Sequence, residues 1–126
     1  HPLKMKPLSI DVHKKSASLD LNYENDIKHT LSAEYLRVFS PSAEVQGHAP
    51  EQAVLQSGKK NVAFKEIEPQ GHYAIKITFS DGHDSGIYSW DYLFELATHQ
   101  ESNWRQYLQA LHAAGKSREP LFIAVD

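Results

Sequence analysis

The sequence contains no cysteine. This absence excludes disulfide bonds, thiolate zinc sites and cysteine-ligated iron–sulfur clusters built by this chain alone. The sequence also lacks an apolar run approaching the roughly 20 residues of a membrane span. The sequence has no excess of basic residues either: its formal net charge is −3 and its isoelectric point is about 6.2. Nucleic-acid-binding domains normally carry a basic face, so we expect this protein to bind no nucleic acid. Since the sequence also has no membrane span, we expect a cytoplasmic protein that does not bind membranes.

Catalytic signatures are also missing. The sequence has no Gly-x-Ser-x-Gly nucleophile motif, no Gly-x-x-x-x-Gly-Lys phosphate-binding loop and no His-Glu-x-x-His zinc motif. The eight histidines are many for this length, but none forms a pair at i and i+4 on a well-predicted helix. For each histidine alone, a structural or solvated role is therefore favoured over metal binding. We expect no enzyme.

The residues that are present predict one small domain over 1–126. The chain has 126 residues and is 40% hydrophobic, which is the usual size and composition of a globular domain. Apolar residues alternate with polar ones, as in strands of an antiparallel sheet with one buried face. The predicted strands are residues 8–12, 19–23, 27–31, 62–67, 73–79 and a short return at 87–88.

Helix signals occupy the remaining segments. Ser32 is a candidate N-cap for a short helix, and Pro50 with Gly58 brackets a second candidate over residues 51–57. Near the C-terminus, apolar residues at helical spacing predict one helix after Ser89 and another around residues 104–111, ending near Gly115. The predicted fold class is α+β, mainly an antiparallel sheet with short helices and two C-terminal helices.

The turn Asp81-Gly82-His83-Asp84 places two carboxylates and one imidazole at the end of the strongest predicted strand. Such groups bind a cation or orient an imidazole in many proteins. The alternative is an ordinary Asp-Gly turn in which Gly82 supplies a positive φ. Local pattern alone favours the ordinary turn.

Four stretches together resemble the N-terminal domain of gamma-butyrobetaine hydroxylase-like proteins, a family that also contains standalone bacterial proteins of unknown function. The resemblance extends over about residues 8–118 and implies a mixed fold with an antiparallel sheet and helices. It depends on Leu-Arg-Val-Phe-Ser-Pro-Ser-Ala-Glu-Val at 36–45, Gly-Lys-Lys-Asn-Val at 58–62, Glu-Pro-Gln-Gly-His-Tyr-Ala at 68–74 and Phe-Ser-Asp-Gly-His-Asp-Ser-Gly-Ile-Tyr-Ser-Trp at 79–90.

The resemblance also raises the question of a metal site. In the hydroxylases, it implies a structural zinc held by three cysteines and by the histidine of Asp-Gly-His. That histidine matches His83, whereas the cysteine positions fall on Ser40, Ser42 and Val45. Neutral hydroxyls are poor zinc ligands and valine is none, so we expect the hydroxylase-type zinc site to be absent.

The resemblance places the iron and 2-oxoglutarate chemistry of the hydroxylases in a separate, larger domain that this sequence does not contain. We therefore expect a non-catalytic binding or adaptor domain with a protein partner, and no cofactor. The predicted contact surface consists of Arg37, His48, Asp81 and Asp84. Related domains are also fused to proteins of iron–sulfur cluster assembly, which implies an accessory role in a metal-cofactor system.

Two alternatives stay open. The first is a weak divalent-metal-binding protein in which His83, aided by His48 and a nearby aspartate, holds the ion through nitrogen and oxygen ligands. The second is an enzyme, which activity of the isolated domain in a 2-oxoglutarate assay would support. The sequence leaves the oligomeric state open.

Overall fold

The first sheet is built from the N-terminal part of the chain. The computed structural model describes residues 6–47 and 52–120. In these ranges the first antiparallel sheet consists, in the order β1-β2-β3, of β1 (Ser9–His13), β2 (Ser18–Asn22) and β3 (Lys28–Ser32). Leu19 and Leu21 of the central strand are completely buried, while the strand residues on either side of each are only partly buried. This is the one-sided burial that the alternating pattern predicts.

The second sheet carries the turn that the sequence singled out. It is also antiparallel, in the order β4-β5-β6, with β4 (Phe64–Gln70), β5 (Ala74–Phe79) and β6 (Gly86–Ser89). Its central strand, β5, is the most buried strand of the sheet, as expected for a strand covered on both edges. The predicted strand positions of both sheets are confirmed to within a few residues at their ends.

Four helices occur in the described ranges: α1 (Ala33–Val38), α2 (Ala43–Gln46), α3 (Trp90–Thr98) and α4 (Gln100–Ala113). Ser32 and Ser89 are the N-caps of α1 and α3, since each side-chain oxygen accepts a hydrogen bond from a backbone N–H three residues later. Ser42 caps α2, which the sequence did not predict. The predicted pair of C-terminal helices is confirmed, with a break at His99.

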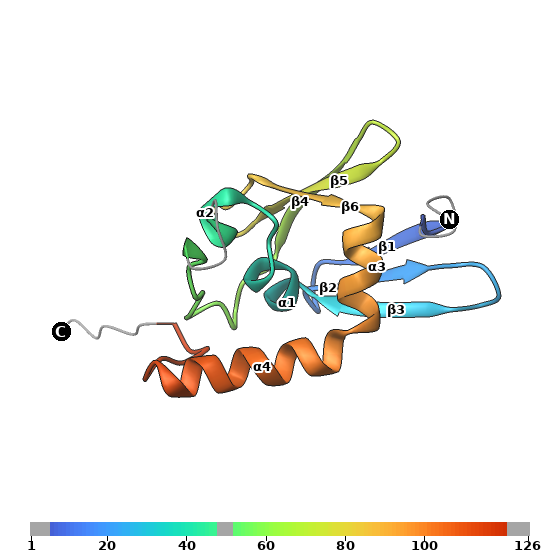
Figure 1. Cartoon of the computed structure of the whole chain (residues 1–126). Helices are drawn as coiled ribbons and strands as arrows, with labels where there is room; N and C mark the ends of the chain where they lie inside the picture. Colours follow the sequence, from blue (N-terminus) through green and yellow to red (C-terminus); the bar gives the residue numbers. More distant parts are fainter. Residues whose placement is uncertain (1–5, 48–51, 121–126) are drawn as a thin grey trace.

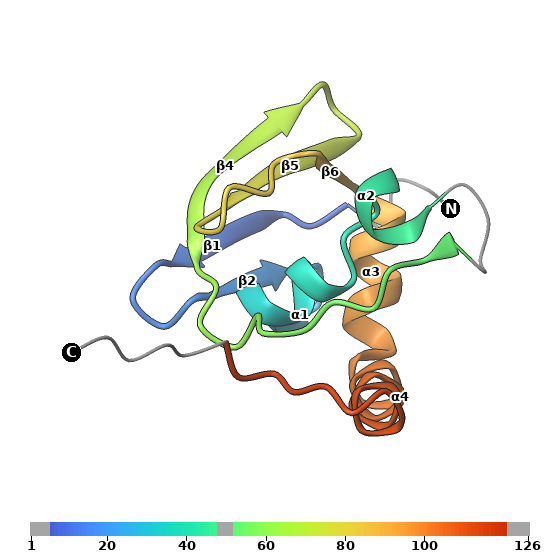
Figure 2. The same ribbon diagram turned by 90° about the vertical axis from the view of Figure 1, so that its left-hand side faces the viewer.

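One hydrophobic core joins the two sheets through α1 and α3. Figures 1 and 2 show the second sheet at one end of the molecule, α4 at the other, and the first sheet with α1 between them. The buried cluster includes Leu21 of β2, Leu36 of α1, Ile77 of β5 and Leu93 of α3. A smaller cluster of Val38, Tyr107 and Leu111 attaches α4 to α1. The predicted fold class, α+β with mainly antiparallel sheet, is confirmed.

The helix predicted for residues 51–57 is wrong. Residues 53–57 form no regular element. They lie in an extended path in which the N–H of Val54 donates to the carbonyl of Val45 at 2.7 Å, and the hydroxyl of Tyr107 donates to the carbonyl of Gln56 at 2.7 Å. These tertiary contacts replace the local hydrogen bonds that the Pro50 and Gly58 signals favoured.

No helix in the described part of the chain is both long enough and apolar enough to cross a membrane.

Candidate functional site

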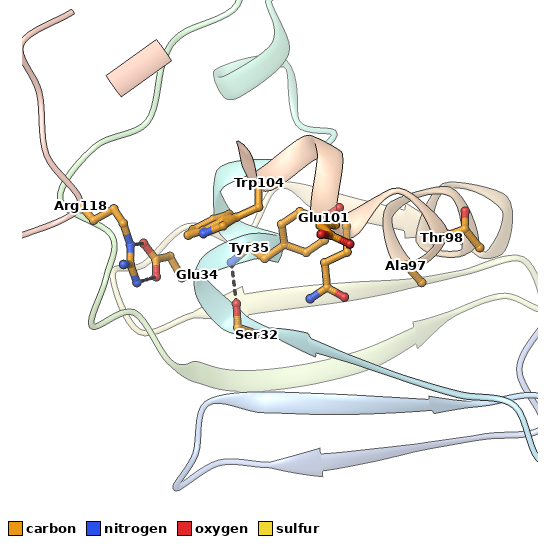
Figure 3. A pocket seen from close by; sticks show the side chains of 9 residues that line it. Ser32, Glu34, Tyr35, Ala97, Thr98, Glu101, Trp104 and Arg118 are labelled. Atoms are coloured by element: carbon orange, nitrogen blue, oxygen red, sulfur yellow. Dashed lines mark hydrogen bonds and ion pairs between the residues drawn. The ribbon is translucent and has the colours of Figure 1, made fainter. Parts of the chain in front are cut away.

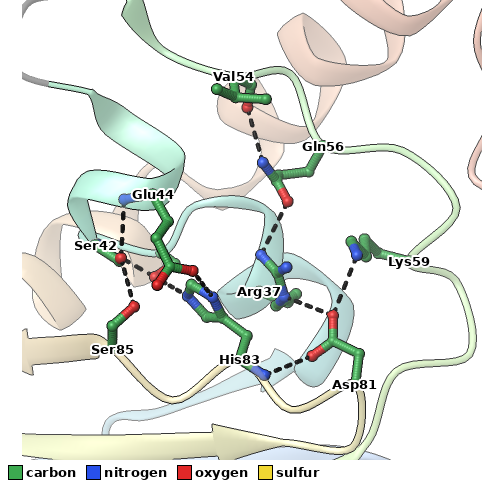
Figure 4. Close-up of polar contacts among 10 residues, drawn as sticks. Arg37, Ser42, Glu44, Val54, Gln56, Lys59, Asp81, His83 and Ser85 are labelled. Carbon is green, nitrogen blue, oxygen red and sulfur yellow. Dashed lines mark hydrogen bonds and ion pairs between the residues drawn. The ribbon is translucent and has the colours of Figure 1, made fainter.

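The predicted site residues lie where the turn after β5 meets the loop between α1 and α2. Residues 80–85 connect β5 to β6, and Gly82 adopts the positive φ of 90° that the Asp-Gly pattern predicts. The N–H of Gly82 donates to the carbonyl of Phe79 at 3.0 Å, and the N–H of Phe79 donates to the carbonyl of His83 at 2.9 Å. These bonds fold the turn back on β5 and aim His83 toward α1 and α2 (Figure 4).

One half of the site is an ionic network centred on Asp81. Its Oδ2 accepts hydrogen bonds from Arg37 Nε at 2.9 Å and from Lys59 Nζ at 3.1 Å. Its Oδ1 accepts from the backbone N–H of His83 at 3.2 Å. Arg37 also donates from Nη1 to Gln56 Oε1 at 3.0 Å. Asp81 thereby connects α1, the segment 56–59 and its own turn (Figure 4).

The other half is a chain of hydrogen bonds through His83. Its Nε2 lies 2.9 Å from Ser40 Oγ, and its Nδ1 lies 3.3 Å from Glu44 Oε2. Glu44 accepts only, so we assign the neutral ring proton to Nδ1 and let the Ser40 hydroxyl donate to Nε2. Ser42 Oγ pairs with Ser85 Oγ at 2.7 Å and caps α2 by accepting from the N–H of Glu44.

The charge states follow from burial and from these partners. Burial lowers the pKa of His83 below its ordinary 6.5, and the nearby Arg37 guanidinium lowers it further, against the opposing effect of Glu44 and Asp81. Burial alone would raise the pKa of Asp81. The hydrogen bonds from the His83 N–H, Arg37 and Lys59 outweigh that effect and hold the pKa of Asp81 below its ordinary value. At neutral pH the site therefore contains a neutral imidazole beside a charged carboxylate.

Ser40, His83 and Glu44 have the connectivity of a hydrolase nucleophile, base and acid. However, a substrate cannot reach the Ser40 hydroxyl in this arrangement. Ser40 is completely buried. The backbone of Gly86 lies so close that a Cβ atom built there would be 2.6 Å from Ser40 Oγ. A reacting carbonyl must approach a nucleophile to about 3–3.5 Å, and here protein atoms already occupy that space. The hydrogen bonds of Ser40, His83 and Glu44 join the loop after α1, α2 and the turn after β5, with the Ser40 hydroxyl enclosed.

The donor set does not fit the zinc that the family resemblance implies. Ser40, Ser42 and Val45 present two neutral hydroxyls and an alkyl group in place of three thiolates. Both ring nitrogens of His83 are engaged with other side chains. Within residues 6–47 and 52–120, no three histidine, aspartate or glutamate side chains are grouped so that they could hold one metal ion.

The structure brings some predicted site residues together and separates others. Arg37 and Asp81 are directly bonded, with Arg37 only 8% exposed, so its guanidinium points inward. Asp84 is exposed to solvent. His48 lies outside the described residues, so its predicted role with His83 stays a prediction.

Sequence reasoning missed Glu44, Gln56 and Lys59. Glu44 and Lys59 stand inside two of the stretches that carry the resemblance, 36–45 and 58–62, whereas Gln56 lies outside all of them. Gln56 and Lys59 belong to a segment without regular structure, and only the fold places them beside Arg37 and Asp81.

Comparison with known proteins decides the family. The family described as gamma-butyrobetaine hydroxylase-like, N-terminal, matches residues 10–94, which is more than half of the chain. The chain belongs to this family. The match includes the whole corner formed by Ser40, Glu44, Asp81 and His83, and it ends before α4. None of the curated proteins matches the chain.

Solved structures support the same assignment. A protein with an NMR solution structure is 53% identical over 95% of this chain and 94% of its own, with a TM-score of 0.79. A second NMR solution structure is 48% identical over 96% of this chain and 91% of its own, with a TM-score of 0.77.

A third relative adds a printed description. It is a crystal structure from Acidithiobacillus ferrooxidans, 33% identical over 77% of this chain and 97% of its own, with a TM-score of 0.63. It is described as a protein with unknown function of the DUF971 family. The names of these relatives contain no catalytic activity.

Proposed function

We propose that this domain is a non-catalytic module that binds a protein partner. The observation that carries the proposal is the closure of the His83 corner. Both ring nitrogens of His83 are engaged, Ser40 is completely buried, and Asp81 is neutralised by Arg37 and Lys59. Because these polar residues are bonded to one another inside the fold, the proposal places the binding of a partner elsewhere on the surface of the domain. The proposal includes no cofactor.

A groove beside β1 is the surface best suited to a partner. A cavity of about 380 Å3 lies between β1 and the second sheet. It is lined by Pro7, Leu8, Ser9, Ile10, Val12, Ile67, Pro69, Ile75 and Trp90. Leu8 is 69% exposed and Val12 is 38% exposed. Exposed apolar side chains gathered at a groove are typical of interaction sites.

The position of β1 favours an extended segment of the partner as the occupant. β1 is an edge strand that pairs with β2 on one side. Leu8, Ser9 and Ile10 are consecutive and all line the groove, so the unpaired edge of β1 faces the groove. A partner strand that pairs with this edge would satisfy backbone groups of β1 and place alternate apolar side chains over Ile67 and Ile75. The resemblance to domains fused to iron–sulfur assembly proteins makes an assembly factor the first class of partner to test.

Affinity capture with crosslinking from native lysate tests the proposal when it compares matched variants. Wild type and Ile27→Asp, an exposed apolar residue outside the groove, should recover the same specific protein. The double variant Leu8→Asp/Val12→Asp should lose it. With the purified partner, calorimetry should show an affinity loss of about tenfold or more for the double variant. Equal recovery by the double variant, or no specific protein at any salt concentration, would contradict the proposal.

A further inference from the structure

A second hollow lies on the α4 side of the molecule and shares no lining residue with the β1 groove. Its volume is about 720 Å3, and Figure 3 shows the side chains around it. The lining residues come from the end of β3, from α1, from the end of α3, from the first turns of α4 and from the segment that follows α4: Ser32, Glu34, Tyr35, Ala97, Thr98, Gln100, Glu101, Trp104 and Arg118.

One end of this hollow already holds a guanidinium group. Arg118 donates from Nε to Glu34 Oε2 and from Nη2 to Glu34 Oε1, both at 2.7 Å. The guanidinium carbon also lies 5.3 Å from the centre of the Trp104 ring. A bidentate carboxylate and an aromatic face together match the planar, multiply donating guanidinium and match an ammonium group much less well. The site is thus built for arginine.

The carboxylate of this site is buried while its cation is accessible. The Glu34 side chain is 8% exposed, whereas that of Arg118 is 37% exposed. A buried carboxylate requires a cationic partner, because its charge has lost the solvation of water. Glu34 belongs to the part of the chain that the family matches, residues 10–94, whereas Trp104 and Arg118 follow it. The family-matched part therefore presents a buried carboxylate that a later segment neutralises.

As far as residue 120, where the described part of the chain ends, the segment that carries Arg118 is held by few bonds to the rest of the fold. The N–H of Gly58 donates to the carbonyl of Ser117 at 2.9 Å, and the N–H of Lys60 donates to the carbonyl of Arg118 at 3.0 Å. A surface ion pair joins Lys60 to Glu119. A segment with so few buried contacts opens at low free-energy cost compared with the core.

The rest of the hollow is open and carries a second carboxylate. Figure 3 shows Glu34 with Arg118 toward one end, Thr98 toward the other, and Glu101 between them near Tyr35. Glu101 forms no ion pair within the described residues. The hollow thus offers one carboxylate, that of Glu101, beyond the Glu34 carboxylate that Arg118 uses, which favours a basic segment as its occupant.

We propose that this hollow is a binding site for an arginine side chain of a second protein, with Arg118 as the internal occupant that the incoming arginine replaces. The incoming guanidinium takes over both oxygens of Glu34 and the face of Trp104, and the segment after α4 is released. Because Arg118 is tethered, it competes at an effective concentration in about the millimolar range, so only a ligand with further contacts in the hollow displaces it. This site is independent of the β1 groove.

The test titrates N-acetyl-arginine amide into three forms of the full chain and follows the indole N–H signal of Trp104 by NMR. Arg118→Ala should bind the probe saturably and about tenfold or more tightly than wild type, because the internal competitor is gone. Glu34→Gln/Arg118→Ala should lose this binding. N-acetyl-lysine amide should bind Arg118→Ala more weakly than the arginine probe, because an ammonium group does not form the bidentate pair.

Equal binding to Arg118→Ala and to the double variant would overturn the proposal, as would equal binding of the two probes or no saturable binding. If Arg118→Ala does not fold, Arg118→Lys replaces it, since this variant keeps the charge but not the bidentate geometry. It is then expected to bind the arginine probe more tightly than wild type does, and no difference would contradict the proposal.

Discussion

Replacing Ser40 by alanine removes one oxygen atom from a completely buried position, and the structure predicts a measurable loss of stability. The lost atom is the partner of His83 Nε2 at 2.9 Å and accepts a longer bond of 3.3 Å from the N–H of Ser42. Alanine keeps the backbone and the Cβ atom, so the packing against Gly86 does not become tighter. The variant therefore isolates the hydrogen bonds.

The magnitude follows from what is left without a partner. A buried polar group that loses its only hydrogen bond costs about 1–3 kcal/mol. His83 Nε2 is such a group, whereas the Ser42 bond is long and contributes less. We expect the free energy of unfolding to fall by about 2 kcal/mol, which corresponds to a melting temperature lower by roughly 6–10 °C for a domain of this size.

Urea unfolding followed by tryptophan fluorescence at pH 7.5 measures this loss. Ser16→Ala is the matched control, because its hydroxyl is exposed and bonds Ser18 at the surface. It should change stability by no more than about 0.5 kcal/mol. In a double-mutant cycle with His83→Gln, the coupling to Ser40→Ala should reach about 1 kcal/mol. A Ser40→Ala loss equal to that of the control would refute the account of the corner.

Three further outcomes are expected. The folded pKa of His83 lies below the unfolded value of 6.5, so the contribution of His83 to stability is complete above pH 6.5 and is lost as the pH falls from there through the folded pKa. Urea midpoints measured from pH 8 to 5 should show this loss in wild type and less of it in His83→Gln. Gly86→Ala should lower stability, because its Cβ would lie 2.6 Å from Ser40 Oγ and 3.1 Å from Tyr88 Cε1; a melting temperature equal to that of wild type would show that the corner is less tightly packed. The triple variant Ser40→Cys/Ser42→Cys/Val45→Cys restores the three thiolates that the family resemblance implies, so it should bind one zinc ion with His83 and gain thermal stability from it. Metal analysis that finds no bound zinc would contradict the idea that only the missing cysteines prevent zinc binding here.

Sequence pattern predicts most of the fold because local chemistry and tertiary context agree there. Leu19 and Leu21 alternate with polar residues and are the buried face of β2. Ser32 and Ser89 are N-caps in the structure as well as in the pattern. In contrast, residues 51–57 carry helix signals, yet the N–H of Val54 donates to the carbonyl of Val45 in α2, and no helical spacing predicts that bond.

The candidate site was predictable only in part. The resemblance associates Ser40, Ser42 and His83, and the structure places Ser40 Oγ and His83 Nε2 at hydrogen-bond distance. The resemblance does not predict that Glu44 pairs with Nδ1 of His83. A helix of four residues is too short for the spacing of apolar residues to show which way Glu44 faces. The sequence assigns no partner to Lys59, and only the fold, which places the turn after β5 beside the segment 58–62, makes it a partner of Asp81.

Metal content and stability of the tag-free protein test the central claim most directly, namely that the His83 corner is closed by hydrogen bonds and leaves the domain to act by binding. Elemental analysis should find no stoichiometric metal, and the urea midpoint should be unchanged by a chelator or by added zinc. The same should hold for His83→Gln, apart from its lower midpoint. One equivalent of metal in wild type that disappears in His83→Gln, together with a midpoint that falls on chelation, would contradict the account.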